Sequence, residues 1–485
     1  MSAVVRLRPV VHASPTDTGL HVRGRASSFT LDGGAGLWKV WQRLARPLTD
    51  GVPVAELAAP AGAAPAVAAA VNAIIGQLRE HDMLVEVPAD RASHPLTEWL
   101  ESVAADPHQA WQRLRDCTIT ISGDAEPAAI ARRAAEGAGL SVEVLVAGPG
   151  LLVAAGEYAV AAGCSADVGW VVPPGSLADV QADFDAVAAR LAGAVGPVPA
   201  VLTAMVASTA VHRLICAVAG LPDPSGEEGS KVLVARLNPV RATYHPWRSG
   251  ATDPITAMDV LTDAELGPLP KPVVADLPQV PARLARCGDV IGVGATADAA
   301  LLDATVGALQ TSSMVVGIGA TQALGSALRL MVLDRPGAEV PAAEWIDEPA
   351  AQRWWKALTV RFGVSATIDV RRLAPGVVRA VIESQGLLAW AVEATAADAV
   401  AFAALAATGH VQAGGANVVC HLNAAIPASL VDDERAGEWR WPVVAAKNEP
   451  ALQAALAALA GRQPERAPLA AVFDAAGMVA YAVES

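Results

Sequence analysis

Residues 117–148 are predicted to run strand, glycine turn, helix, strand, and this order narrows the fold class more than any other stretch. The segment begins with CTITIS, turns at Gly123, continues through the alanine-rich AAIARRAAEGAG and ends with SVEVLV. Alternating apolar residues indicate a strand, and a strand–helix–strand unit is typical of α/β domains. A chain of 485 residues has room for two to four domains. We therefore predict an α/β multidomain protein.

Charge and hydropathy exclude some classes of protein. Hydrophobic residues make up 53% of the chain, enough for packed cores, and the formal net charge is −14. A nucleic-acid binder needs clustered Lys and Arg to neutralise phosphates, so we expect no nucleic-acid partner. No secretory signal peptide is visible, and the alanine-rich runs are cut by Pro and Gly. We expect a cytoplasmic protein without membrane association.

The cysteines predict neither a metal site nor a disulfide framework. The chain has five, and none forms a CxxC pair: Cys117, Cys164, Cys216, Cys287 and Cys420. A structural zinc site normally uses closely spaced pairs, so we expect buried thiols in a reducing compartment. His421 follows Cys420 directly, but neighbouring strand residues point to opposite faces, which disfavours a Cys–His dyad.

The first 88 residues are predicted to form a separate module. Extended pieces lead to the strand SSFTL at 27–31, and the turn DGG follows it. A helix at 36–45, a short helix at 54–59 with Asp50 as its possible cap, and a long helix over 67–78 come next. The piece MLVEV closes the module, so the pattern is that of a winged-helix-like α+β unit.

On the long helix, apolar side chains recur at helical spacing and predict one buried stripe. Its members are Val67, Val71, Ile74, Ile75 and Leu78.

Polar, proline-containing linkers divide the rest of the chain. They lie at 88–95 and around 248–255, so we predict domains at 1–88, 89–250 and 251–485. The last domain contains a short internal repeat, in which a G-x-G-A-T turn precedes an apolar helix, once beginning at Gly292 and again at Gly317. Neither turn has Lys or Arg close behind, so tight packing explains the glycines as well as a phosphate would.

No convincing catalytic constellation is found, and we predict no catalytic residue and no metal ligand. The turn at Gly123 is followed by Asp124 and Glu126, which would repel a phosphate. His245, in TYHPW, is interpreted either as lining a pocket or as a packed strand terminus. A large chain of this kind is often the partner of an enzyme.

The first module resembles the PqqD-like recognition domain of enzymes that modify ribosomal peptides. The likeness lies in SSFTL, DGGAG, LWKVWQRL, VAELAA and the long helix. In that family the leader of a precursor peptide adds as a strand and packs against the third helix. The resemblance implies peptide-binding residues on the strand and on the edge of the helix: Ser27, Ser28, Phe29, Thr30, Leu31, Ala70, Ala73, Ile74 and Gln77.

The centre of the chain is similar to the ThiF-like domain of azole-forming cyclodehydratases, in ITISGDAEPAAIARRAAEGAGL and the stretch from VLTAMV to TYHPW. It lacks that family's glycine loop. The last region resembles a shortened YcaO domain, in DPITAMDVLTDAELGPL and GVGATADAALLDATVGALQ. Gly307 stands where active YcaO proteins have a glutamate that helps hold magnesium and ATP. The resemblance implies that both bind to a separate YcaO subunit, and no cofactor is expected in this chain.

These likenesses predict a leader-binding, non-catalytic partner subunit. It would deliver a ribosomal precursor peptide to a YcaO cyclodehydratase that forms thiazolines or oxazolines from Cys, Ser or Thr in thiopeptide-type biosynthesis. Two alternatives remain open: an ATP-dependent peptide-modifying enzyme in its own right, or a scaffold for modification enzymes. The sequence also leaves a homo-oligomer open.

Overall fold

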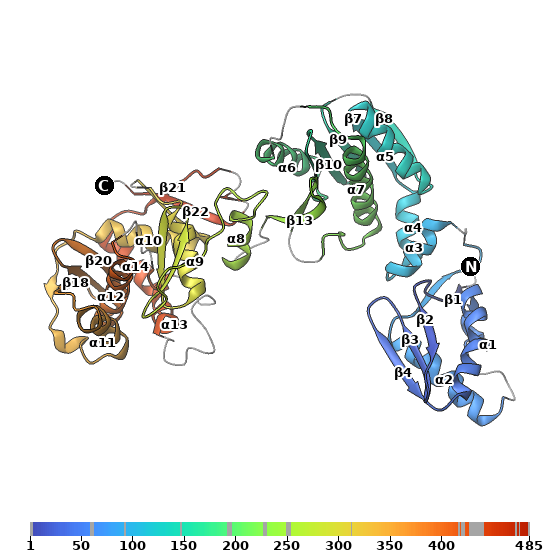
Figure 1. The fold of residues 1–485 in the computed structure, drawn as a ribbon, viewed down its shortest axis with the longest axis horizontal. Coiled ribbons are helices and arrows are strands. Elements are labelled where there is room, and N and C mark those ends of the chain that lie inside the picture. The colour runs from blue at the N-terminus through green and yellow to red at the C-terminus, as the bar shows by residue number, and fades with distance from the viewer. Residues whose placement is uncertain are drawn as a thin grey trace. The chain divides into compact units, whose positions relative to one another are not determined.

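The computed structural model describes most of the chain (Figure 1). The described residues are 3–58, 63–91, 94–145, 148–191, 196–226, 230–248, 254–311, 313–415, 418, 422–425, 441–470, 473–474 and 476–483. Cys420 and His421 lie outside them. The architecture is mixed α/β with several sheets, in two compact units formed by residues 1–228 with 233–243, and by 229–232 with 244–485. The predicted boundary at residue 88 falls inside the first unit, and the three-domain division stays a prediction.

The N-terminal module holds two small antiparallel sheets. The first has the order β5-β1-β6, with β1 at Ala3–Leu7, β5 at Val52–Pro53 and β6 at Leu84–Pro88. The second has the order β2-β3-β4, with β2 at His12–Pro15, β3 at Gly19–Arg23 and β4 at Ser28–Asp32. The strand predicted at 27–31 is thus confirmed within one residue at each end.

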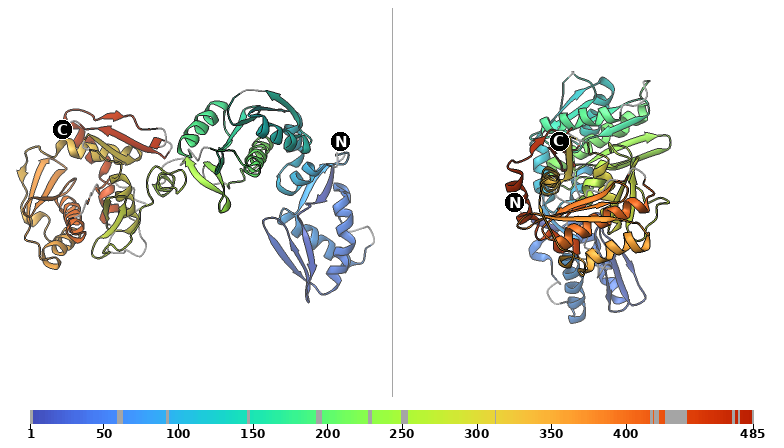
Figure 2. Two further views of the ribbon diagram at one scale, coloured as in Figure 1. Left: turned by 45° about the horizontal axis from the view of Figure 1, so that its top comes forward. Right: turned by 90° about the vertical axis from the view of Figure 1, so that its left-hand side faces the viewer.

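Two helices pack on these sheets: α1 at Gly36–Asp50 and α2 at Pro65–Glu80. The second sheet lies on one side of the module and α1 on the other (Figures 1 and 2). The prediction of a short helix at 54–59 is wrong, because the described residues 54–58 form only one 3-10 turn, η1 at Val54–Glu56. Asp50 ends α1 instead of capping a new helix. Pairing of Val52 with Val5 of β1 draws this segment into a strand, and tertiary pairing overrides a weak helical preference.

A seven-stranded sheet follows along the chain, with the order β13-β12-β11-β10-β9-β7-β8. Its strands are β7 Thr118–Gly123, β8 Ser141–Leu145, β9 Leu151–Ala155, β10 Tyr158–Cys164, β11 Val168–Val171, β12 Ser230–Leu237 and β13 Val240–Arg248. The strands β7 and β8 are parallel, joined by α5 at Ala125–Gly137, which confirms the predicted strand–helix–strand unit. Three further helices precede or cover the sheet: α3 Pro95–Val103, α4 Pro107–Arg115 and α6 Leu177–Arg190.

Helix α7, at Ala200–Ala219, is the apolar core helix of this unit. By length and composition it could cross a membrane, and it is the one such helix in the described part of the chain, but 56% of the tested stretch is buried inside the protein. It carries a fully buried cation, Arg213, whose guanidinium contacts Asp223 at 2.9 Å. A buried ion pair of this kind suits the core helix of a folded domain.

The second unit is built from antiparallel sheets and covering helices. Its sheets have the orders β14-β15, β16-β22-β21 and β17-β18-β19-β20. The strands are β14 Arg283–Cys287, β15 Val290–Gly294, β16 Met314–Ile318, β17 Ala338–Glu339, β18 Thr367–Ala374, β19 Val377–Glu383, β20 Leu387–Glu393, β21 Glu465–Ala467 and β22 Met478–Ala482. The helices are α8 Pro254–Leu261, α9 Ala297–Gly307, α10 Gly319–Val332, η2 Ala342–Glu344, α11 Pro349–Lys356, η3 Ala357–Arg361, α12 Ala396–Gln412, α13 Trp441–Ala446 and α14 Glu449–Ala460.

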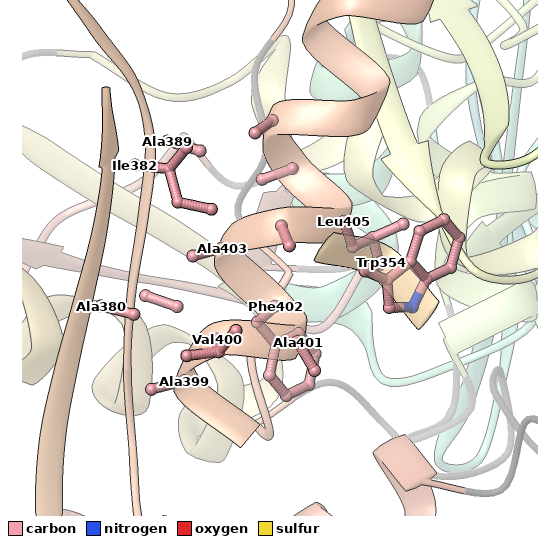
Figure 3. Packing of buried hydrophobic residues seen from close by; sticks show 14 of the residues in the cluster. Trp354, Ala380, Ile382, Ala389, Ala399, Val400, Ala401, Phe402, Ala403 and Leu405 are labelled. Atoms are coloured by element: carbon pink, nitrogen blue, oxygen red, sulfur yellow. The ribbon is translucent and has the colours of Figure 1, made fainter. Parts of the chain in front are cut away.

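The largest core of this unit lies around α12. Figure 3 shows Ala403 on the side of the strands that carry Ala380 and Ile382, while Leu405 lies toward Trp354. Both Ile382 and Trp354 are fully buried. Small alanines let the helix approach the sheet closely on one side, and large side chains fill the other.

Candidate functional site

Strand β4 is an edge strand with free backbone groups. Within the described residues it pairs with β3 alone, with Val22 opposite Phe29 and Arg23 opposite Ser28. At the turn between the strands, the Gly24 N–H donates to the Ser27 carbonyl at 2.9 Å. Bonded and non-bonded pairs alternate in an antiparallel ladder. The backbone groups of Phe29 therefore point to β3, and those of Ser28 and Thr30 point to the free edge.

The side chains of β4 alternate between the core and the surface. Phe29 is buried and Leu31 is half-buried, while Ser28 and Thr30 are exposed. The Thr30 hydroxyl lies 2.9 Å from Nδ1 of His21, across the strand pair. An incoming strand would therefore find a polar outer face and an apolar inner face.

One flank of α2 faces this edge. The Phe29 ring stacks on His81, directly after α2, with centroids 5.1 Å apart, and the Ser27 hydroxyl donates to the His81 carbonyl at 3.2 Å. By helical geometry, Ala70, Ala73 and Gln77 lie on the same flank as His81. Ala73 is exposed, and the other two are half-buried. The contacts of Phe29 and Ser27 with His81 thus place the C-terminal end of this flank against the predicted strand residues.

Ile74 belongs to the core of the module instead of to this flank. It is fully buried, whereas Val67, assigned from sequence to the buried stripe, is 39% exposed. The buried residues of α2 are Val71, Ile74, Ile75 and Leu78, and Val67 lies on the same stripe, in the first turn of the helix. The peptide-binding roles of the other predicted residues stay predictions.

The opposite flank of α2 borders a cavity that the sequence did not indicate. It has a volume of about 550 Å³, lies between α1 and α2, and is mostly apolar, with Lys39 and Arg43 at its lining. Val67 and Val71 form part of its wall. The partial exposure of Val67 follows from this cavity.

The turn between β7 and α5 is filled by the protein's own backbone. The Asp124 N–H donates to the Gly150 carbonyl at 2.8 Å, and the Asp124 carboxylate accepts from the Gly150 N–H at 3.0 Å. A Cβ on Gly123 would lie 2.1 Å from the Gly150 carbonyl oxygen, so this close approach requires glycine. With Glu126 in the first turn of α5, the turn suits packing better than phosphate binding, as the sequence indicated.

The glycines of the two G-x-G-A-T turns lie directly against helices. A Cβ on Gly292 would be 2.1 Å from the Ala304 nitrogen of α9, and one on Gly317 would be 2.6 Å from the Ala323 nitrogen of α10. The buried carboxylate of Asp303, on α9, accepts a hydrogen bond from the Val293 N–H of the first G-x-G-A-T turn at 2.8 Å. Helix-on-strand packing therefore accounts for these glycines.

The second unit contains a buried charge cluster that was not predicted from the sequence. The Arg329 guanidinium lies 2.9 Å from Glu393 and 2.7 Å from Glu449, and all three side chains are buried. Burial raises the pKa of Glu393 to about 7, although Arg329 opposes the shift. The three residues are 64 and 120 positions apart, so no local signal links them. Gly307 is itself buried, at the end of α9.

His245 is a strand-terminus residue held by a carboxylate. Its Nδ1 lies 2.9 Å from Asp263, whose other contacts are the N–H groups of Glu265 and Leu266. Burial favours a higher pKa for Asp263, but the hydrogen bonds from His245 and the two N–H groups hold it below its usual range. This geometry agrees with the interpretation of TYHPW as a packed strand terminus.

Among the described residues, no group of three or more His, Cys, Asp or Glu could hold a metal ion. The four cysteines that the structure describes are free: Cys117, Cys164, Cys216 and Cys287.

No protein-family model matches the chain, and no curated protein matches it. Solved structures similar to this chain include heterocyclases and a microcin biosynthetic enzyme. A heterocyclase in complex with substrate and cofactor is 11% identical, with a TM-score of 0.48, over 99% of this chain and 94% of that one.

Two further solved structures are similar to this chain. The heterocyclase TruD has 11% identity and a TM-score of 0.42 over 99% of this chain and 94% of its own. MccB of E. coli, with AMPCPP and MccA, has 9% identity and a TM-score of 0.35 over 50% of this chain and 96% of its own.

Proposed function

We propose that this chain binds the leader of a ribosomal precursor peptide along the free edge of β4. The observation that carries the proposal is the outward direction of the Ser28 and Thr30 backbone groups, on the strand whose Phe29 stacks on His81 at the end of α2. An unpaired strand edge is a template for another strand. Main-chain hydrogen bonds would supply affinity, and the small side chain of Ala73 would leave room for side chains of the leader.

In this proposal the chain does not itself carry out the chemistry. It delivers the precursor to a separate YcaO cyclodehydratase, which uses ATP and magnesium to form thiazolines or oxazolines. The packed turn at Gly123 and the packed glycines at Gly292 and Gly317 support this division of labour. Tethering the leader would raise the effective concentration of the core peptide at the enzyme, commonly to about the millimolar range.

Fluorescence anisotropy of a labelled leader peptide, titrated with the full chain, tests the proposal. The leader comes from the precursor gene next to the gene of this protein. We expect saturable binding that Thr30→Pro weakens at least about tenfold, because proline removes an outward N–H from the edge. Leu31→Asp should also weaken binding, because it places a charge on the apolar inner face.

The opposite edge of the same sheet offers a matched control. By the same alternation, the N–H of Ala13 on β2 points away from β3, so Ala13→Pro makes the equivalent change at the wrong edge. Equal loss of binding in the Ala13 and Thr30 variants would reject the β4 edge. Absence of any saturable binding by the unsubstituted chain would reject leader recognition.

A further inference from the structure

A second cavity lies in the first unit, between the turn that precedes β4 and helix α7. It has a volume of about 430 Å³, within the usual size range of ligand pockets. Trp99 of α3 and His212 of α7 form one wall, with ring centroids 5.8 Å apart in an edge-to-face arrangement. Cys216, one helical turn after His212, lines the cavity as well.

The rest of the lining is mostly apolar. Val103, Leu221, Pro222 and Pro224 contribute to it, and the one lining carboxylate, Asp223, is already bound by the buried guanidinium of Arg213. This chemistry suits a bulky aliphatic or aromatic side chain. Prolines and ring faces offer such a side chain apolar contact without leaving buried donors unsatisfied.

The cavity and the free edge of β4 are connected by Arg25. This residue lines the cavity, and its guanidinium donates to the Val103 carbonyl at 3.0 Å. Arg25 lies in the turn between β3 and β4, only three positions before Ser28, where β4 begins. A strand that runs antiparallel to β4 would leave the edge at Ser28 and pass along this turn.

We propose that this cavity binds one bulky apolar side chain of the precursor peptide, on the C-terminal side of the segment paired with β4. The side chain lies about three to five residues beyond the last residue paired with the edge. Antiparallel addition continues the pattern of β2, β3 and β4 and is the slightly more stable of the two pairings. The inference rests on the proposed function, and it adds a second site that selects the precursor by side chain.

The test uses the full chain and two labelled peptides from the precursor. The short one contains only the segment that pairs with the edge, and the long one extends from it by eight residues toward the C-terminus. The informative variant is His212→Trp, because His212 is exposed and a larger ring there fills the cavity. Val201→Trp is the control, since Val201 lies on the same helix, is 57% exposed and does not line the cavity.

We expect the long peptide to bind at least about tenfold more tightly than the short one, since one buried apolar side chain contributes that much. His212→Trp should abolish this difference and leave the affinity for the short peptide unchanged, and Val201→Trp should change neither. Alanine substitution in the long peptide should locate the anchor three to five residues past the paired segment.

Three results would overturn the inference. The first is an equal affinity of both peptides, sensitive to Thr30→Pro but not to His212→Trp, which leaves leader binding at β4 intact and rejects the cavity. The second is a gain in affinity from an N-terminal extension instead, which means parallel addition. The third is no binding of either peptide, in which case the proposed function fails together with the cavity.

Discussion

Glu101 is the residue that joins the N-terminal module to the rest of the first unit. It lies on α3 and is 1% exposed, with Arg6 of β1 and Arg91 each at 2.7 Å from its carboxylate. Arg8 adds hydrogen bonds to the carbonyls of Glu101 and Ala104, both at 2.8 Å. The stretch at 88–95, predicted as a linker, therefore carries an anchoring residue.

Glu101→Ala should destabilise the first unit by about 3 kcal/mol, because it leaves two largely buried guanidinium groups without their partner. Denaturant unfolding of the full chain measures the change, and limited proteolysis around residue 91 reports the loosened junction. Glu98→Ala is the control, on an exposed position of the same helix. Equal stabilities of the two variants would show that the cluster contributes nothing.

At the scale of elements, close contact between helix and strand decides where glycine is required. The strand β15 and the helix α9 approach so closely that Gly292 has no room for a side chain, whereas Gly76, on the exposed face of α2, has nothing within 4 Å of the place of a Cβ. Glycine at position 292 thus allows a helix and a strand to pack closely, whereas glycine at position 76 only weakens the helix α2.

Gly292→Ala should lower stability by about 2–3 kcal/mol, because the added methyl group overlaps the backbone of α9. Gly76→Ala should raise it by about 1 kcal/mol, because alanine is the better helix former. Thermal unfolding of both variants measures these changes. If Gly292→Ala were neutral but abolished nucleotide binding by the chain, the turn would be a phosphate site after all.

At the scale of the whole molecule, Arg329 holds together distant parts of the second unit. It connects α10 to the end of β20 through Glu393 and to the start of α14 through Glu449. Two carboxylates share one guanidinium in a buried site, so the cluster carries an excess negative charge when both are ionised. Burial is the main reason that the pKa of Glu393 rises to about 7.

This shift predicts a pH dependence with a definite sign. Between a pH of about 4.5 and about 7 the folded chain keeps the Glu393 proton, which the unfolded chain releases. The contribution of Glu393 to stability is therefore largest at low pH and is lost as the pH rises through about 7. In Glu393→Gln this part of the pH dependence should be absent.

Unfolding free energies of the unsubstituted chain and of Glu393→Gln, measured from pH 5 to 8, provide the comparison. Glu465→Gln, on an exposed position of β21, controls for the loss of one charge. The difference between Glu393→Gln and the unsubstituted chain should change across this range, and that for Glu465→Gln should stay constant. A constant difference for Glu393→Gln would mean that its carboxylate stays ionised throughout.

Local patterns predicted many elements of this chain correctly. Alternation and the following turn located β4, helical spacing located α1 and α2, and the strand–helix–strand order located β7, α5 and β8. These patterns lie within one helix or strand or between elements adjacent in the sequence, and local backbone preferences act over the same range. The segment around Pro53 failed because its pairing partner is β1, almost fifty residues earlier.

The sequence by itself determined the strand β4, the helices α1 and α2 and the unit of β7, α5 and β8. Only the tertiary structure decided which flank of α2 faces β4, since that depends on the stacking of Phe29 on His81. The burial of Ile74, the cluster at Glu101, the Arg329 cluster and the cavity at Trp99 and His212 likewise join residues far apart in the chain. Contacts at such separations follow from how whole elements pack, and no local pattern of residues encodes them.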